Sequence, residues 1–157
     1  MYQKILVPLD GSELAECVLP HVEGVVKGCQ AKEVIFVRVA EPVPLAIFGE
    51  EFLGDAREWQ RIGEQNQAAA ENYLKRLVGQ LQYGNIKIQS EVLMGGRTAD
   101  IIADYATKNE VDLIVIATHG RSGISRWVWG SVADRVLRAA CAPVLMVRPP
   151  GCVPAGI

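Results

Sequence analysis

The chain has 157 residues, of which 50% are hydrophobic and 22% are charged, and its formal net charge is −2. This length suits one domain with a substantial core, and the slightly acidic balance excludes a dedicated nucleic-acid binder, which needs clustered Lys and Arg. No apolar run approaches the ~20 residues that cross a bilayer. The opening MYQKILVPL shows no signal peptide. We therefore expect a cytoplasmic protein without nucleic-acid or membrane contacts, with one domain over residues 1–149 and a flexible tail over 150–157.

Short apolar segments alternate with longer helical patterns along the chain. LIVIA (113–117) is continuously apolar, as is typical of a strand buried on both faces. Pro20 falls inside the first helical pattern, where a proline predicts a kink. The expected strands cover residues 4–9, 34–39, 86–93, 113–117 and 143–147, and the expected helices lie near 13–28, 56–82, 98–108 and 131–140.

This alternation predicts an α/β fold, an open doubly wound parallel sheet of five strands with helices on both faces. In such sheets ligands bind beyond the carboxyl ends of the strands. The loops that follow strands are therefore the places to look for a site. They cover residues 10–12, 40–55, 95–97 and 118–130.

Several common catalytic and metal-binding patterns are absent from the sequence. There is no G-x-G-x-x-G, no Gly-Lys dipeptide for a Walker A loop and no G-x-S-x-G. The four cysteines form no C-x-x-C pair, and the two histidines, His21 and His119, offer few candidates for a zinc site or a catalytic triad. These absences disfavour hydrolases, metalloproteins and disulfide-stabilised folds, and no catalytic residue is identified.

The segment THGRSGISRWVWGS, residues 118–131, joins the LIVIA strand to the last helix. Gly120 permits close approach of a ligand to the backbone. Gly130 and Ser131 place N–H groups and a hydroxyl at a helix N-terminus, where the helix dipole favours an anion. Together with Arg121, this pattern predicts a phosphate-binding loop; the alternative is a connector whose glycines only turn the chain.

The spacing of this loop resembles the G-2x-G-9x-G-[ST] signature of the universal stress protein (UspA-like) family. KILVPLDGS near the start of the chain, VRVAEP in the middle and APVLMVRP near the end resemble other segments of that family. The sequence departs from the signature at its first glycine, which is Ala117 here. Alanine still allows close backbone approach but disfavours a positive φ.

The resemblance implies a Rossmann-like homodimer of strand order 3-2-1-4-5. The last strand has prolines on either side, as suits the sheet edge, but its apolar VLMV carries no Lys or inward charge to guard an open edge, so we expect the dimer to pair through this strand, residues 143–148. One branch of the family binds ATP and another does not, and the retained loop glycines indicate the ATP-binding branch, with Mg²⁺ or Mn²⁺ held mainly by the phosphates. By position, Pro8 and Asp10 would lie beside the adenosine, Val39 would meet adenine and Ala117 would approach the ribose. The phosphates would be held by Gly120, Gly130, Ser131 and Val132, and the same loop adds Thr118, His119, Arg121 and Gly123 as candidate cofactor-binding residues.

Three functions remain open at this stage. The first is an ATP-binding regulatory protein of the stress response with little or no catalysis, acting on protein partners that the sequence does not identify. The second is an ATP-free dimeric interaction module, which the alanine at position 117 favours. The third is a slow ATPase. Asp10 has two possible roles as well: hydrogen bonding to a ribose or amino group, or satisfying its own turn at Gly11 and Ser12.

Overall fold

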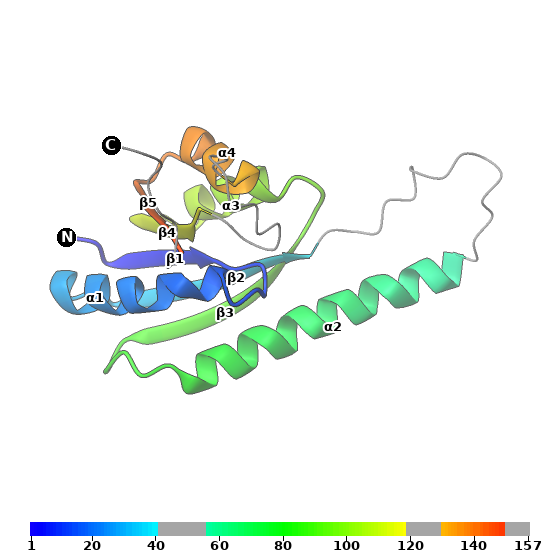
Figure 1. The fold of residues 1–157 in the computed structure, drawn as a ribbon, viewed down its shortest axis with the longest axis horizontal. Coiled ribbons are helices and arrows are strands. Elements are labelled where there is room, and N and C mark those ends of the chain that lie inside the picture. Colours follow the sequence, from blue (N-terminus) through cyan, green and yellow to red (C-terminus); the bar gives the residue numbers. More distant parts are fainter. Residues whose placement is uncertain (41–55, 119–129, 150–157) are drawn as a thin grey trace.

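The computed structural model describes residues 1–40, 56–118 and 130–149, and the predicted tail at 150–157 lies outside them. Strands and helices alternate along the chain (Figure 1). No helix in these three ranges is long and apolar enough to cross a membrane. The strands are β1 (Lys4–Pro8), β2 (Glu33–Ala40), β3 (Lys87–Met94), β4 (Leu113–Ala117) and β5 (Val144–Val147); the helices are the 3-10 helix η1 (Ala15–Val18), α1 (Leu19–Cys29), α2 (Ala56–Gln80), α3 (Thr98–Lys108) and α4 (Ser131–Ala139).

The five strands form one parallel sheet in the order β3-β2-β1-β4-β5, which confirms the predicted fold class and strand order. β1 lies in the middle, where Ile5 is in register with Val34 of β2 and with Leu113 of β4. β2 and then β3 are added on one side of β1, and β4 and then β5 are added on the other side. The winding direction therefore reverses between β1 and β4, where an open sheet of this kind leaves a crevice.

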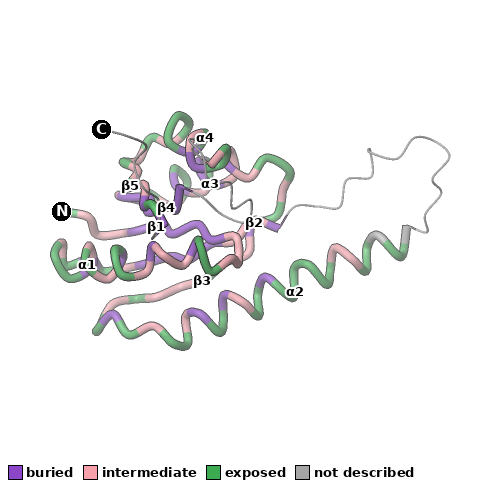
Figure 2. The backbone as a smooth tube through the Cα atoms, viewed as in Figure 1, coloured by how far each residue is buried: buried purple, intermediate pink, exposed green. Residues whose placement is uncertain are grey.

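Each face of the sheet packs against two helices (Figure 2). Phe36 of β2 and Val115 of β4 pack with Val22 of α1 and Leu74 of α2 in one buried cluster. The other cluster holds residues of α3 and α4, including Ile102. Side chains alternate between these two clusters along the buried strands, so the near-continuous apolar strands follow from burial on both faces.

The first helical segment differs from the single kinked helix that the sequence predicts. It consists of η1 followed directly by α1, and Pro20 is the second residue of α1. Proline is tolerated in the first turn of a helix because the N–H that it lacks would have no partner there. The proline therefore marks where a new helix starts. The other helices begin and end within two residues of the expected positions.

Helix α2 is 25 residues long and extends beyond the sheet (Figure 1). Its second half packs on the sheet through Ala70, Leu74 and Leu77, which are all buried. Most of its described side chains before Ala70 are exposed. The middle of α2 therefore lies at the rim of the sheet, beside the carboxyl ends of the strands.

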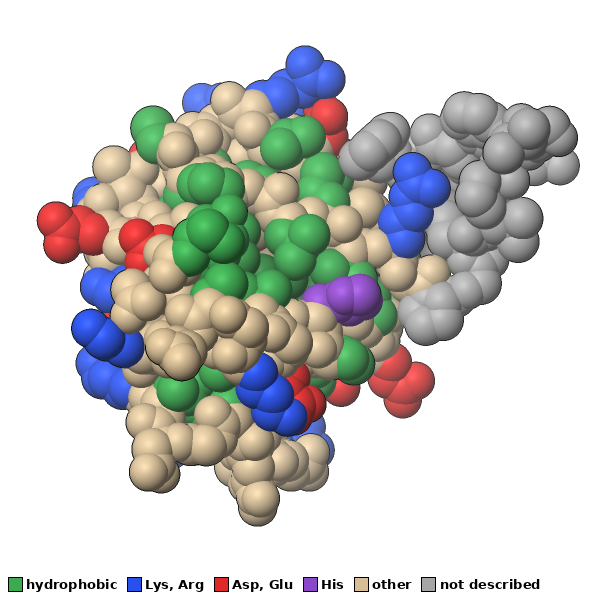
Figure 3. All heavy atoms as spheres, turned by 90° about the vertical axis from the view of Figure 1, so that its left-hand side faces the viewer, with side chains coloured by type: hydrophobic (Ala, Val, Ile, Leu, Met, Phe, Trp, Pro, Cys, Tyr) green, Lys and Arg blue, Asp and Glu red, His purple; other side chains and the backbone are tan. Residues whose placement is uncertain are grey.

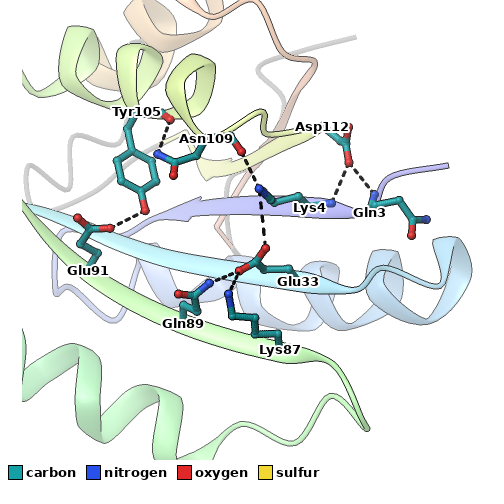
Figure 4. Close-up of polar contacts among 9 residues, drawn as sticks. All are labelled: Gln3, Lys4, Glu33, Lys87, Gln89, Glu91, Tyr105, Asn109 and Asp112. Atoms are coloured by element: carbon teal, nitrogen blue, oxygen red, sulfur yellow. Dashed lines mark hydrogen bonds and ion pairs between the residues drawn. The ribbon is translucent and has the colours of Figure 1, made fainter.

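At the amino ends of the strands, polar side chains bond to one another and to the backbone (Figure 4). Asp112, just before β4, accepts hydrogen bonds of 2.9 Å from the backbone N–H groups of Gln3 and Lys4. Glu33 accepts from Gln89, pairs with Lys87 at 2.8 Å and lies 3.9 Å from the Lys4 ammonium. The pKa of each of these carboxyls is lowered: for Glu33 mainly by the Lys87 hydrogen bond, and for Asp112 mainly by the backbone N–H of Lys4.

Candidate functional site

A cavity of about 540 Å³ opens at the carboxyl ends of β1, β2 and β4. Its lining also includes residues from the middle of α2 and from the first turns of α3 and α4. This is the position at which an open α/β sheet places its ligand. The cavity is therefore the candidate site of the described part of the chain.

The two sides of the cavity differ in chemistry. Val37 and Val39 of β2, with Ile102 of α3 and Ile116 of β4, line it with apolar groups. Such a surface suits a flat, weakly polar group such as a nucleobase. The ionisable side chains among the described lining residues are Asp10 and Arg38, which carry opposite charges.

The start of α4 forms the other end of the cavity. Gly130 and Ser131 line it, and no described side chain caps this helix terminus. The Gly130 N–H donates to the carbonyl of Thr118 at 2.7 Å, which holds the start of α4 beside the end of β4. The free N–H groups of an uncapped helix start, together with the helix dipole, favour an anionic group here.

Asp10 lies just beyond the end of β1. Its Oδ1 accepts hydrogen bonds from the backbone N–H of Ser12 at 2.9 Å and from the Ser12 hydroxyl at 2.6 Å. The Ser12 hydroxyl in turn accepts from the N–H of Ala15 at 3.2 Å, which ties the turn to η1. Asp10 thus satisfies its own turn, as one of its two predicted roles requires, and it also lines the cavity.

The cavity brings together eight of the residues predicted from the sequence. The remaining four, His119, Gly120, Arg121 and Gly123, lie outside the described residues. Those in the lining are Pro8, Asp10, Val39, Ala117, Thr118, Gly130, Ser131 and Val132.

Sequence reasoning missed the contributions of Arg38, Asn66 and Thr98 to this lining. Thr98 begins α3 just after the glycine turn that follows β3, so the rule that sites lie at the carboxyl edge could have indicated it. Arg38 is a charged residue near the carboxyl end of β2, where the strand residues that follow Glu33 are otherwise apolar, and this was a usable signal. Asn66 lies inside α2, and its position at the cavity depends on how α2 packs, which no local pattern reveals.

The sheet order and the cavity at its carboxyl edge define a doubly wound α/β protein with a candidate ligand site at the switch point. The model of the Universal stress protein family matches residues 1–148, and the chain belongs to this family. A relative, Universal stress protein MJ0531 of Methanocaldococcus jannaschii, is 33% identical over 152 residues, which cover 96% of this chain and 84% of the relative.

Solved structures of the same fold agree with this assignment. The structure of protein MJ0577 is 30% identical, with a TM-score of 0.71, and covers 96% of this chain and 99% of its own. A universal stress protein in complex with cAMP is 22% identical with a TM-score of 0.59, covering 94% of this chain and 98% of its own. An Arabidopsis thaliana family member with AMP bound is 15% identical with a TM-score of 0.59, covering 95% of this chain and 93% of its own. At the identities of these last two, the likeness concerns the fold alone.

Proposed function

We propose that this protein binds ATP in the carboxyl-edge cavity and acts as a regulatory protein of the stress response. The observation that carries the proposal is the cavity itself, which joins an apolar lining to the N-terminus of α4, a helix start that no side chain of the described residues is seen to cap. Two proteins of similar fold are described with cAMP or AMP bound, which supports an adenine nucleotide as the ligand class.

The dimensions of the cavity fit a nucleotide. Its volume of about 540 Å³ lies within the range of small-molecule sites, and its lining extends from β2 across β1 to β4, two strands whose axes are roughly 10 Å apart. A base on the β2 side would pack against Val39, and its phosphates would reach the N–H groups at Ser131. Asp10, beside β1, would lie between them at the level of the ribose.

The metal would accompany the ligand in this proposal. The described residues contain no group of three or more His, Cys, Asp or Glu side chains placed to hold an ion. Mg²⁺ or Mn²⁺ would therefore be held mainly by the phosphate oxygens, as is usual for nucleotide sites. With binding residues but no identified catalytic base, we propose that occupancy by ATP acts in the cytoplasm as a signal to protein partners.

A second part of the proposal is a homodimer formed through β5. This strand is at the edge of the sheet, and Leu145 on it is 37% exposed, while Leu137 on the neighbouring α4 is 45% exposed. From the side on which β5 and the N-terminus lie in Figure 1, hydrophobic side chains gather on the surface (Figure 3). An edge strand with apolar side chains is stabilised by pairing with the same strand of a second chain.

The dimer is tested by sedimentation of wild type and Met146→Pro. The N–H groups of Ile114 and Thr118 donate to the carbonyls of Pro143 and Val147, so alternate backbone groups of β5 face β4 and the N–H of Met146 faces the open edge. Proline at 146 removes that edge donor, so the variant should sediment as a monomer while retaining its circular dichroism spectrum. A wild-type protein that is monomeric at micromolar concentration contradicts this part of the proposal.

The ligand is tested by purifying the protein, denaturing it and identifying any released nucleotide by mass spectrometry. A fluorescent ATP analogue is then displaced with ATP, AMP and cAMP in the presence of Mg²⁺. The proposal expects ATP to displace the analogue at the lowest concentration, because the start of α4 favours the more highly charged phosphate chain. Absence of any adenine nucleotide and of analogue binding, in a protein that still dimerises, would establish the ATP-free module.

A further inference from the structure

Arg38 of β2 lies against the turn that carries Asp10. Gly11, in the centre of that turn, has a φ of +85°, and a Cβ placed on it would lie 2.9 Å from a guanidinium nitrogen of Arg38. The guanidinium therefore packs directly on the backbone of the turn. The positive φ favours glycine at position 11, and the absent side chain leaves the room that the guanidinium occupies.

The ring of Tyr73, on α2, packs against the same guanidinium. The Cζ atom of Arg38 lies 5.4 Å from the centre of this ring, within the range of a cation–π interaction. The Tyr73 hydroxyl donates a hydrogen bond of 2.9 Å to Glu16 of η1. Burial and this hydrogen bond raise the pKa of Tyr73, so the phenol stays neutral at physiological pH and holds both partners.

These contacts join separate parts of the fold at the cavity. The Asp10 turn follows β1, Arg38 comes from β2, Glu16 from η1 and Tyr73 from α2. Both Asp10 and Arg38 line the cavity. Asp10 is also bonded within its turn to the N–H and hydroxyl of Ser12, so the place of its carboxylate is coupled to the conformation of the turn.

We infer that Arg38 is a positioning residue, which holds the turn at Gly11 so that the Asp10 carboxylate meets the ligand in a fixed place. The inference rests on the proposed nucleotide binding and adds a residue to it. A planar guanidinium can lie between a peptide backbone and an aromatic ring, whereas the compact ammonium of lysine cannot fill that space in the same way. Arginine at position 38 is therefore not exchangeable with lysine.

The test compares ATP affinities of wild type, Arg38→Met, Arg38→Lys and a matched control, Arg138→Met, by calorimetry with Mg²⁺. Arg138 lies in the last turn of α4, in an exposed ion pair with Asp134. We expect Arg38→Met to weaken binding about tenfold, the size of one interaction with a charged group. Arg38→Lys should restore little of this loss, and Arg138→Met should bind as wild type does.

A double-mutant cycle separates positioning from direct contact. If Arg38 acts through Asp10, then Arg38→Met added to Asp10→Asn should cause little further loss of affinity. If the loss of ATP affinity in the double variant equals the product of the losses in the two single variants, Arg38 contacts the ligand by itself. That result would overturn the positioning role. Tyr73→Phe keeps the ring and should bind like wild type, while Tyr73→Leu should resemble Arg38→Met.

The outcomes distinguish this inference from the function on which it rests. A wild type that binds no nucleotide refutes the proposed function. If wild type binds ATP and both Arg38→Met and Arg38→Lys bind it with the same affinity as wild type, the positioning role is refuted and the proposed function stands. Circular dichroism checks that each variant folds. If Arg38→Met does not fold, the ATP affinities of Tyr73→Phe and Tyr73→Leu decide, and equal affinities of these two variants overturn the inference.

Discussion

The two edges of the sheet use polar residues in different ways. At the amino edge, Asp112 and Glu33 bond to neighbouring backbone and side chains, and the strands begin in a closed network (Figure 4). At the carboxyl edge, Asp10, Arg38 and Ser131 surround a cavity of about 540 Å³. β1, β2 and β4 thus begin at a polar network at one edge and end at an open pocket at the other.

This difference separates stability from binding. Polar groups whose partners are all within the protein contribute to folding, and their removal leaves donors or acceptors unsatisfied. Polar groups that line a cavity are available to a ligand, and their removal affects binding more than folding. We therefore expect substitutions at the amino edge to change stability with little effect on ATP affinity, and substitutions at the carboxyl edge to do the reverse.

The largest expected effect is at the apolar side of the cavity. Val39→Trp places an indole in space that the proposed base occupies and should weaken ATP binding roughly 100-fold, about 3 kcal/mol. Calorimetry measures the affinity. Ser90→Trp, at an exposed position of β3, is the control and should bind normally. Equal affinities for Val39→Trp and wild type would place the base elsewhere.

At the amino edge, Asp112→Ala leaves the backbone N–H groups of Gln3 and Lys4 without their carboxylate. We expect a loss of about 2 kcal/mol in the free energy of unfolding at pH 7, measured with urea, and unchanged ATP affinity. Asp104→Ala, an exposed carboxylate on α3, should change stability little. A substantial loss of ATP affinity in folded Asp112→Ala would break the separation between the edges.

The stability difference at Asp112 should depend on pH. Because its pKa is lowered in the folded state, mainly by the N–H of Lys4, its contribution is present above the unfolded value and is lost as the pH falls through the folded value. The gap between wild type and Asp112→Ala should therefore narrow below about pH 4. A stability difference between wild type and Asp112→Ala that stays constant down to pH 2 would contradict the role assigned to the Asp112 carboxylate.

A smaller effect is expected at the start of α4. Ser131→Ala removes one hydroxyl that can bond to phosphate and should reduce ATP affinity by about 1–2 kcal/mol. Its stability should not fall, since alanine is the better helix former. A Ser131→Ala variant with full affinity would assign the phosphate contact to the backbone alone.

The smallest effect should come from Lys87→Met, again at the amino edge. Lys87 is largely exposed, with 64% of its side chain accessible, and Glu33 keeps its contacts with Gln89 and Lys4. We expect a loss of stability below about 1 kcal/mol. The pKa of Glu33, followed by NMR, should rise toward its ordinary value, because the Lys87 hydrogen bond is the main cause of its lowering.

Much of the fold could be predicted from the sequence because periodicity and strand burial are local properties. The apolar run at 113–117 predicted β4 with its bounds, and the alternation of elements predicted the parallel sheet. The strand order came from the family resemblance. The break before α1 was missed because a proline in the first turn of a helix and one in its middle look alike in sequence.

The site was predictable where residues follow strands or begin helices, as at Asp10 and Ser131. Arg38 and Asn66 could not be placed in the same way. The orientation of the Arg38 side chain depends on Gly11 and Tyr73, which are 27 residues before and 35 residues after it in the chain. Such contacts arise from packing between distant segments, and no local spacing reveals them.

Calorimetric titration of the wild-type protein with ATP and Mg²⁺ tests the central claim most directly. The carboxyl-edge cavity predicts saturable binding with one nucleotide per chain, which Val39→Trp weakens strongly and Asp112→Ala leaves unchanged. Absence of binding heat up to millimolar ATP, in a folded protein that contains no bound nucleotide after purification, would contradict it.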